Sequence, residues 1–344
     1  MKAKLVASDS LSTEAETVIF SKEAVKPSSD RSRLLVPLTT MAGMLTTLAT
    51  LLSTKFIWNF TPASPEDAPE LLYFDRGSFM FAAMFIYTTV PLLFTAYTIW
   101  NSPKTAVLWS NIETVSLQSG ILLMYFLTYF LTANGYVQPW EDKITPGRRI
   151  HFARYMGWHV AQAGYAYLIM CKFNRQSLRD ALPYILVTPL QDTFGLWADA
   201  ASSLPMREFL HALTWSSYLL GAFGLWHTMP PPKPAEVATE KVKRGFVHFS
   251  IVHWFIYGPV YHLGQYGAIS SATEQLLYCM LDISYKMIAS TTLVVVNSAE
   301  WTQMRLAAEH EESMTREEEE FQQRLQMMRD ALQQQQQQQQ EVCK

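Results

Sequence analysis

The chain has 344 residues, of which 49% are hydrophobic and 13% aromatic, while only 17% are charged. Soluble proteins carry about 25% charged residues, so the composition disfavours a purely soluble protein. The formal net charge of −3 argues against a nucleic-acid partner. The three cysteines, Cys171, Cys279 and Cys343, form no spaced framework, so we expect neither a disulfide nor a metal site.

The N-terminal part divides into three stretches. Residues 1–33 are polar without periodicity, and we expect them to be disordered. Residues 34–58 form a long apolar stretch behind basic residues. They predict a signal-anchor helix, with a cleaved leader as the alternative. Residues 59–76 are acidic and rich in proline, and we expect them to be extracellular.

Residues 77–297 contain seven apolar segments, each near the length that a bilayer crossing requires. These segments are 77–100, 107–131, 149–173, 178–197, 209–226, 245–266 and 275–297. Lysine and arginine gather in alternate connections, which predicts that the core starts outside the cell and ends in the cytoplasm. We therefore predict an all-α membrane protein with a seven-transmembrane-helix bundle and an extra N-terminal hydrophobic helix. The plasma membrane of a eukaryote is the expected location.

The C-terminal part reads as a helical tail. Residues 298–332 are charged and predict a cytoplasmic helix. Their apolar residues follow a heptad-like spacing that is too short to predict a coiled coil. Residues 333–344 contain a glutamine run and are of low complexity. We expect no enzyme domain after this tail and no enzymatic activity.

An acid and a lysine stand near the middle of the last apolar segment. Asp282 and Lys286 each cost roughly 2.5–3.5 kcal/mol in the centre of a membrane helix. Because they are four residues apart, they share one helical face and can pair. The pair is either a structural ion pair between helices or part of a functional site.

Two motifs together resemble those of the microbial (type I) rhodopsins over about residues 77–297. They are the Asp282–Lys286 pair and, in the third core segment, the run Ala153-Arg154-Tyr155-Met156-Gly157-Trp158. The resemblance implies that Lys286 binds all-trans-retinal as a Schiff base and that Asp282 is its counterion. It also places Trp158 on one face of the retinal.

The resemblance extends to aromatic residues of other segments. Trp254, Tyr257 and Pro259 are similar to the aromatic wall on the opposite face of the retinal. Tyr125 stands about where the family has a tyrosine that hydrogen-bonds the acid of the last helix, and Tyr129, one turn further on, is the alternative.

Departures from the family pattern indicate the type of rhodopsin. Gly157 stands where a proton pump has its acceptor carboxylate, and Leu168 stands where a pump has its cytoplasmic donor. Outward proton pumping by the usual relay is therefore disfavoured. Tyr285, directly before the lysine, is unusual, and we expect it to perturb the Schiff base. The combination looks most like the anion channelrhodopsins, which implies a light-gated anion channel for chloride.

Three residues are candidates for the ion pathway. Arg154 would favour anions over cations, and Gln118 lies on the polar face of the second core segment. Glu113 is either a gate carboxylate or a helix-end residue near the headgroups. Besides membrane lipid and small anions, the expected partners are a second copy of the chain and a cytoplasmic protein that binds the tail.

Two other functions stay open on the sequence. One is a non-conducting sensory rhodopsin that signals through its C-terminal helix, and the other is a light-gated cation channel. For four of the histidines in or near the membrane segments we expect packing or pathway-lining roles, because no pair shows ligand spacing. They are His159, His211, His253 and His262.

Overall fold

A computed structural model describes residues 69–100, 106–232 and 238–342 of the chain. The predicted disordered N-terminus (1–33) and the signal-anchor or leader helix (34–58) lie outside the described residues. So do residues 59–68 of the predicted extracellular segment.

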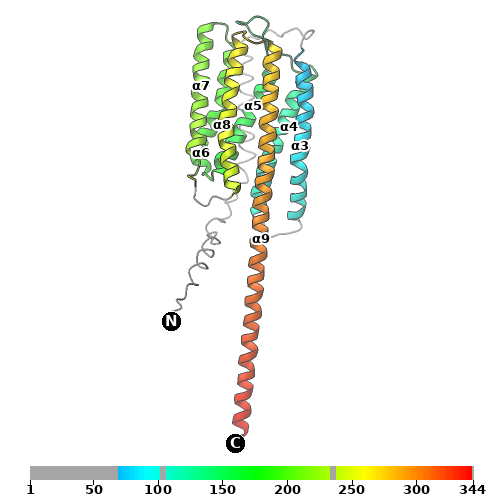
Figure 1. The fold of residues 1–344 in the computed structure, drawn as a ribbon, viewed down its shortest axis with the longest axis vertical. Coiled ribbons are helices and arrows are strands. Elements are labelled where there is room, and N and C mark those ends of the chain that lie inside the picture. The colour runs from blue at the N-terminus through cyan, green and yellow to red at the C-terminus, as the bar shows by residue number, and fades with distance from the viewer. Residues whose placement is uncertain (1–68, 101–105, 233–237, 343–344) are drawn as a thin grey trace, which may run out of the picture.

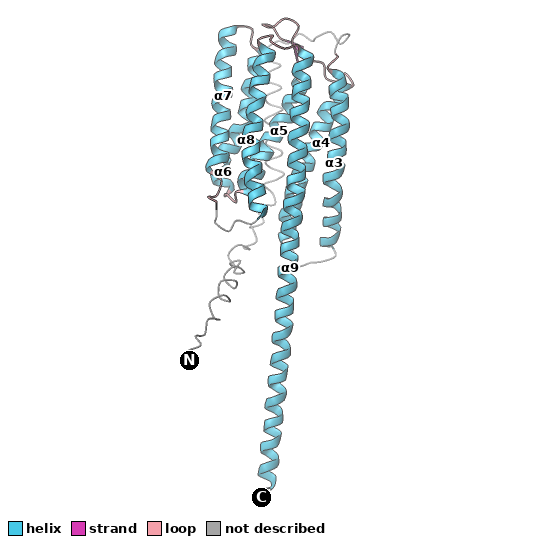
Figure 2. Cartoon of the chain, viewed as in Figure 1, coloured by secondary structure: helices cyan, strands magenta, loops and turns pink. Residues whose placement is uncertain are grey.

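The described residues form seven α-helices, one π-helical segment and one two-stranded hairpin. In chain order they are α3 (Leu71–Trp100), α4 (Ala106–Ala133), β1 (Trp140–Glu141), β2 (Arg149–Ile150), α5 (Phe152–Tyr167), η3 (Leu168–Phe173), α6 (Leu178–Ala200), α7 (Leu204–His227), α8 (Ala238–Gln265) and α9 (Ser271–Val342). Figure 2 shows that helix accounts for nearly all of the described residues. The prediction of an all-α bundle with seven core helices is confirmed.

The helices stand side by side in a closed ring. Consecutive helices pack against each other from α3 to α9, and α9 also packs against α3 and α4. The β1–β2 hairpin lies at one end of the bundle, which we call the hairpin end (Figure 1). The helix α9 leaves the bundle at the opposite end, the tail end, and continues far beyond it (Figure 1).

Several helix boundaries differ from those predicted from hydropathy. The helices α3, α7 and α8 begin at Leu71, Leu204 and Ala238, several residues before the apolar segments. Charged residues just before the apolar segments, such as Arg76, Arg207 and Lys243, lower the hydropathy there, but the helix continues through them. The helix α5 begins at Phe152 because Arg149–Ile150 pairs with β1 as an antiparallel strand.

Apolar side chains cover much of the outside of the bundle, whereas many polar ones are buried. Leu186, Leu219 and Phe223 are exposed, while Asp192 and Ser250 are buried. By length and composition, two helical stretches are apolar enough to cross a membrane, Glu113–Ala133 and Ser271–Glu300. In the other core helices of the described chain, polar residues inside the bundle, such as Asp192, Thr193 and Ser250, lower the mean hydropathy.

Candidate functional site

Lys286 lies on α9 in the middle of the bundle and is only 3% exposed. Its Nζ atom donates a hydrogen bond of 2.6 Å to the Tyr125 hydroxyl on α4 and one of 3.2 Å to Asp282 Oδ1. The Tyr125 ring centroid is 3.9 Å from the same Nζ atom. A lysine side chain is therefore held inside the bundle by one acid and one aromatic ring.

Asp282 is fully buried one turn before the lysine, and three helices donate hydrogen bonds to it. The Tyr129 hydroxyl of α4 is 2.6 Å from Oδ2, and the Trp158 Nε1 of α5 is 2.9 Å from Oδ1. The Tyr257 hydroxyl of α8 is 2.8 Å from Oδ1. The alternative that Tyr129 bonds this acid is thus correct, and the placement of Tyr125 against Asp282 is wrong. Tyr125 lies one turn away and bonds the lysine instead.

Arg154 approaches the same acid from α5. Its Nε atom lies 3.7 Å from Asp282 Oδ2, and its Nη1 donates to the side-chain oxygen of Gln275. The guanidinium also lies over the Phe74 ring, 4.7 Å from its centroid. Nε and Nη2 are buried without a hydrogen-bond partner among the described residues. We call Lys286, Asp282 and Arg154 the Lys286 cluster.

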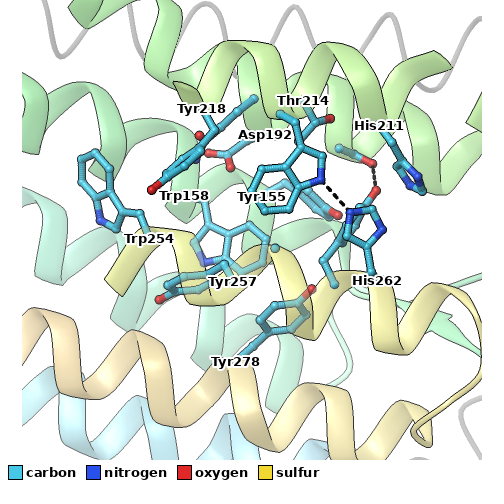
Figure 3. Close-up of a pocket in the computed structure, with 15 residues that line it drawn as sticks. Tyr155, Trp158, Asp192, His211, Thr214, Tyr218, Trp254, Tyr257, His262 and Tyr278 are labelled. Atoms are coloured by element: carbon cyan, nitrogen blue, oxygen red, sulfur yellow. Dashed lines mark hydrogen bonds between the residues drawn. The ribbon is translucent and has the colours of Figure 1, made fainter. Parts of the chain in front are cut away.

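A cavity begins at Lys286 and is lined largely by aromatic side chains. It holds about 400 Å³ of empty space between Trp158 on one helix and Trp254 on another, with Tyr257 and Tyr285 beside them. A second cavity of about 550 Å³ shares both tryptophans and continues between α7 and α8 (Figure 3). The buried amine, the aromatic walls and the two adjoining cavities together fit a long polyene aldehyde such as retinal.

Tyr285 and Gly157 lie close to this cavity and differ in their distance from the lysine nitrogen's partners. The Tyr285 hydroxyl is 3.0 Å from the Ser250 Oγ of α8, so it does not point at the lysine nitrogen. A Cβ atom at Gly157 would meet Thr128 Oγ1 and the Tyr125 ring at 3.5 Å. Gly157, the position where a proton pump has its acceptor carboxylate, therefore lies next to Tyr125, which bonds Lys286.

Pro259 does not belong to the aromatic wall. It is exposed on the outside of α8 and lines neither cavity. Successive residues of a helix are about 100° apart, and Trp254 and Tyr257 occupy the inner face, which turns Pro259 outward. The prediction for this residue is wrong.

Asp192 on α6 is a cavity residue that the sequence analysis missed. It is buried and lines both cavities. Its Oδ1 accepts a hydrogen bond of 3.0 Å from Gln162 Nε2, while Oδ2 has no partner among the described residues. Figure 3 shows Asp192 close to Trp158. An acid inside an apolar segment was the available signal, because such a residue is costly in a membrane helix.

The candidate pathway residues Glu113 and Gln118 lie on α4 toward the tail end. The Glu113 carboxylate accepts hydrogen bonds of 2.5 Å from both the Tyr167 hydroxyl and the Lys172 ammonium. Gln118 is buried, and its Nε2 donates a hydrogen bond of 2.8 Å to the Ser290 hydroxyl of α9. Both side chains therefore connect α4 to neighbouring helices. No group of three or more residues suited to a metal ion occurs within the described part of the chain.

A second buried set of charges lies at the hairpin end. We call Arg148, Arg207, Asp142, Asp199 and Glu274 the Arg148 cluster. Arg148 lies 3.0 Å from Asp142, 2.6 Å from Asp199 and 2.6 Å from Glu274, and Arg207 pairs with Asp142. Burial lowers the pKa of Arg148, but the carboxylates of Asp199 and Glu274 more than reverse this and raise it well above its usual value.

The family profile described as Bacteriorhodopsin-like protein matches residues 76–297. This match covers more than half of the chain, and the chain belongs to this family. Members of the family bind retinal in a membrane, which agrees with the buried Lys286 and its aromatic cavity. No curated protein sequence matches the chain.

Solved structures share the fold at low sequence identity. The transmembrane domain and linker region of Salpingoeca rosetta rhodopsin phosphodiesterase is 14% identical with a TM-score of 0.60, and the match covers 79% of this chain and 87% of that one. Its transmembrane domain alone is also 14% identical, with a TM-score of 0.58 and coverages of 75% and 98%. The proton pumping rhodopsin AR2 from Acetabularia acetabulum is 13% identical, with a TM-score of 0.57 and coverages of 70% and 99%.

Proposed function

We propose that the chain is a light sensor that holds all-trans-retinal on Lys286 and passes its signal along α9. The observation that carries this proposal is that Lys286 and the exposed tail belong to one unbroken helix, Ser271–Val342. Bound retinal supplies a light-driven isomerisation and, as a protonated Schiff base, one buried positive charge. Asp282 balances that charge, and Tyr129, Trp158 and Tyr257 hold the carboxylate in place.

Polar contacts at three levels join α8 to the helix that carries the lysine. Tyr257 bonds Asp282 beside the cavity, and Ser250 bonds Tyr285 nearer the tail end. Beyond them, Lys243 bonds Glu300 with 2.5 Å between Nζ and Oε1. A displacement of α8 relative to α9 at the cavity would therefore change contacts as far as Glu300.

The Lys243–Glu300 pair lies where α9 leaves the bundle. Lys243 is only 4% exposed and also bonds Glu240 at 3.1 Å. A buried ammonium that loses its carboxylate partner is left with a large desolvation cost. The pair therefore favours one arrangement of α8 against α9, and a light-driven change in the bundle has to break or move it.

The location and partners of the protein follow from this proposal. We place the tail end in the cytoplasm of a eukaryotic cell and the hairpin end outside its plasma membrane, as the distribution of lysine and arginine predicts. The exposed tail would bind a cytoplasmic protein or the tail of a second copy. The chain itself would have no enzymatic activity.

A light-gated anion channel is the second candidate function. Its support is the charge around Lys286. Gly157 carries no carboxylate, and Arg154 has two buried nitrogen atoms without a hydrogen-bond partner among the described residues, although its Nε lies 3.7 Å from Asp282. Positive groups along a pathway favour anions. Asp192 adds a carboxyl group to the same cavity and weighs against this candidate if it is ionised. A cation channel is the least supported of the three functions.

Pulsed electron paramagnetic resonance tests the sensor proposal on the full chain in lipid nanodiscs. Spin labels at the exposed positions Val242 and Thr302 report the distance between α8 and α9 at the tail end. We expect this distance to change on illumination. Lys243→Gln should release α8 from α9 already in the dark and so reduce the light-induced change. Lys241→Gln, at an exposed neighbour on the same helix, should leave the change as it is.

A pigment with a normal visible band and no light-induced change in this distance would overturn the sensor proposal. Patch-clamp recording under illumination, with chloride varied, tests the second candidate. A photocurrent that reverses near the chloride equilibrium potential in cells without other partners would support the anion channel. Reversal that follows the cation gradient would support the cation channel.

A further inference from the structure

The cavity that begins at Lys286 continues to a polar end between α7 and α8. This end is lined by His211 and Thr214 of α7 and by His262 of α8. In Figure 3 the two histidines lie on the side of the cavity opposite Trp254. The ring centroids of the histidines are 4.7 Å apart, and the rings are nearly perpendicular.

The tautomer of His262 follows from its neighbour Trp215. The indole Nε1 of Trp215 lies 2.8 Å from His262 Nε2. An indole nitrogen only donates, so His262 Nε2 is unprotonated and the neutral ring carries its hydrogen on Nδ1. That Nδ1 atom is buried and has no hydrogen-bond partner within the described residues. His262 therefore presents a buried donor that no described residue accepts.

His211 is 4% exposed, and neither of its ring nitrogens has a hydrogen-bond partner in the described part of the chain. The carboxylate of Glu208 lies 3.6 Å from Nδ1, too far for a hydrogen bond. The Tyr266 hydroxyl donates to Glu208 at 2.6 Å. A neutral His211 thus adds one donor and one acceptor to the donor of His262.

We propose that the retinaldehyde bound by this protein carries a hydroxyl group on its ring, held by His211 and His262. The inference rests on the proposed attachment at Lys286, because an aldehyde bound there leaves the ring at the far end of the cavity. A hydrocarbon ring would leave His262 Nδ1 and both ring nitrogens of His211 buried without a hydrogen-bond partner among the described residues, which costs free energy for each unsatisfied group. A hydroxyl both donates and accepts, and it matches the donor of one histidine and the lone pair of the other.

Competition between two aldehydes tests the proposal. The full-length apoprotein is incubated with equal amounts of all-trans-retinal and all-trans-3-hydroxyretinal, and the bound retinoids are extracted as oximes and separated. We expect the hydroxylated aldehyde to be enriched about fivefold, as one net hydrogen bond predicts. His211→Leu and His262→Leu should each bring the ratio close to one. His227→Leu, an exposed histidine at the end of α7, is the matched control and should keep the enrichment.

Each outcome has a defined meaning. Equal uptake by the wild-type protein, or an enrichment that survives both leucine variants, overturns this inference alone. Uptake that favours unmodified retinal would also overturn the inference, because water would then supply the hydrogen bonds of the two histidines. If neither aldehyde forms a pigment, the proposed attachment at Lys286 fails. A leucine variant that forms no pigment is replaced by His211→Gln, which keeps a donor and an acceptor and should retain part of the enrichment.

Discussion

The Lys286 cluster and the Arg148 cluster are both buried in the same bundle, but their polar atoms are satisfied to different degrees. Arg148 and Arg207 face three carboxylates, and none of these five residues has a buried polar side-chain atom without a partner. Within the Lys286 cluster, by contrast, Arg154 has two such orphaned atoms, and the neighbouring residues Asp192, Gln162 and Tyr165 have one each. Beside the Arg148 cluster, one occurs on Gln265, which bonds Asp199.

This difference separates a structural cluster from a functional one. An unpaired buried polar atom costs about 1–3 kcal/mol, so such atoms are rare unless a water, a ligand or a second conformation uses them. Five acidic and basic groups in mutual contact at the hairpin end fix three helices and a hairpin. The incomplete set around Lys286 is left free to respond when the charge in the cavity moves.

Removal of Lys286 should have the largest effect on the pigment. Lys286→Ala, expressed with all-trans-retinal, should show no visible absorption band, because no other described amine lines the cavity. Absorption spectroscopy of the purified protein checks this result. Lys172→Ala, which alters a lysine at the tail end of the bundle, should keep the band. A surviving pigment in Lys286→Ala would refute the assignment.

The counterion should have the next largest effect. Asp282→Asn removes the carboxylate that lies 3.2 Å from the lysine nitrogen. The visible band should then disappear at a pH lower by about 1–3 units, because an opposite charge at this distance stabilises the protonated form. Spectrophotometric titration measures the midpoint. Asp192→Asn is the comparison and should move it less; equal shifts would mean that the two acids share the role.

The Arg148 cluster should respond in stability and not in colour. Arg148→Gln leaves three buried carboxylates with fewer partners, and loss of one member of a buried pair costs about 3–5 kcal/mol. Thermal unfolding followed by circular dichroism should show this loss, while the band stays in place. Arg324→Gln in the exposed tail should change neither. A large colour shift in Arg148→Gln would contradict a purely structural role.

A carboxylate added beside the Lys286 cluster should change the colour of the pigment. In Gly157→Asp the new Cβ atom meets its nearest neighbours at 3.5 Å, an ordinary van der Waals distance. A negative charge near the lysine nitrogen stabilises the ground state more than the excited state, by several kcal/mol at low dielectric, so the band should move to shorter wavelength. Gly157→Asn, of the same size, should shift it much less. An unmoved band with an infrared signal of ionised carboxylate would contradict this prediction.

The smallest expected effect is the pH dependence contributed by Asp142. Burial raises the pKa of this carboxyl, but hydrogen bonds from Arg207 and two backbone amides, with the charge of Arg148, outweigh burial and lower it. The stabilisation is therefore complete above the unfolded-state pKa of about 3.9 and is lost as the pH falls through the folded-state value. Unfolding temperatures should fall in this acid range. Asp142→Asn should be less stable at neutral pH and should lose less on acidification.

Much of the Lys286 cluster could be predicted from the sequence because charges inside apolar segments are costly. Asp282, Lys286 and Arg154 stand out for this reason, and helical spacing already placed the first two on one face. The choice between Tyr125 and Tyr129 could not be made, because both lie on the same face of α4 one turn apart. Which of them meets Asp282 depends on how far α4 is shifted along α9.

The Arg148 cluster could not be predicted. Its members come from a loop and the ends of three helices, where charged residues are common and carry no signal. The pairing of Arg148 with Glu274 joins residues far apart in the chain, and no spacing rule connects them. Pro259 was assigned to the aromatic wall from the resemblance alone, although its helical spacing from Trp254 and Tyr257 turns it to the other face.

The length of α9 gives the tail a mechanical role. From Lys286 to Val342 the helix rises by about 84 Å at about 1.5 Å per residue. If the segment moved as a rigid rod, a tilt of about 5° at the lysine would displace the far end by about 7 Å. Under the proposed sensor function, a small tilt of α9 beside Lys286 would thus become a movement of several ångströms at the far end of the tail.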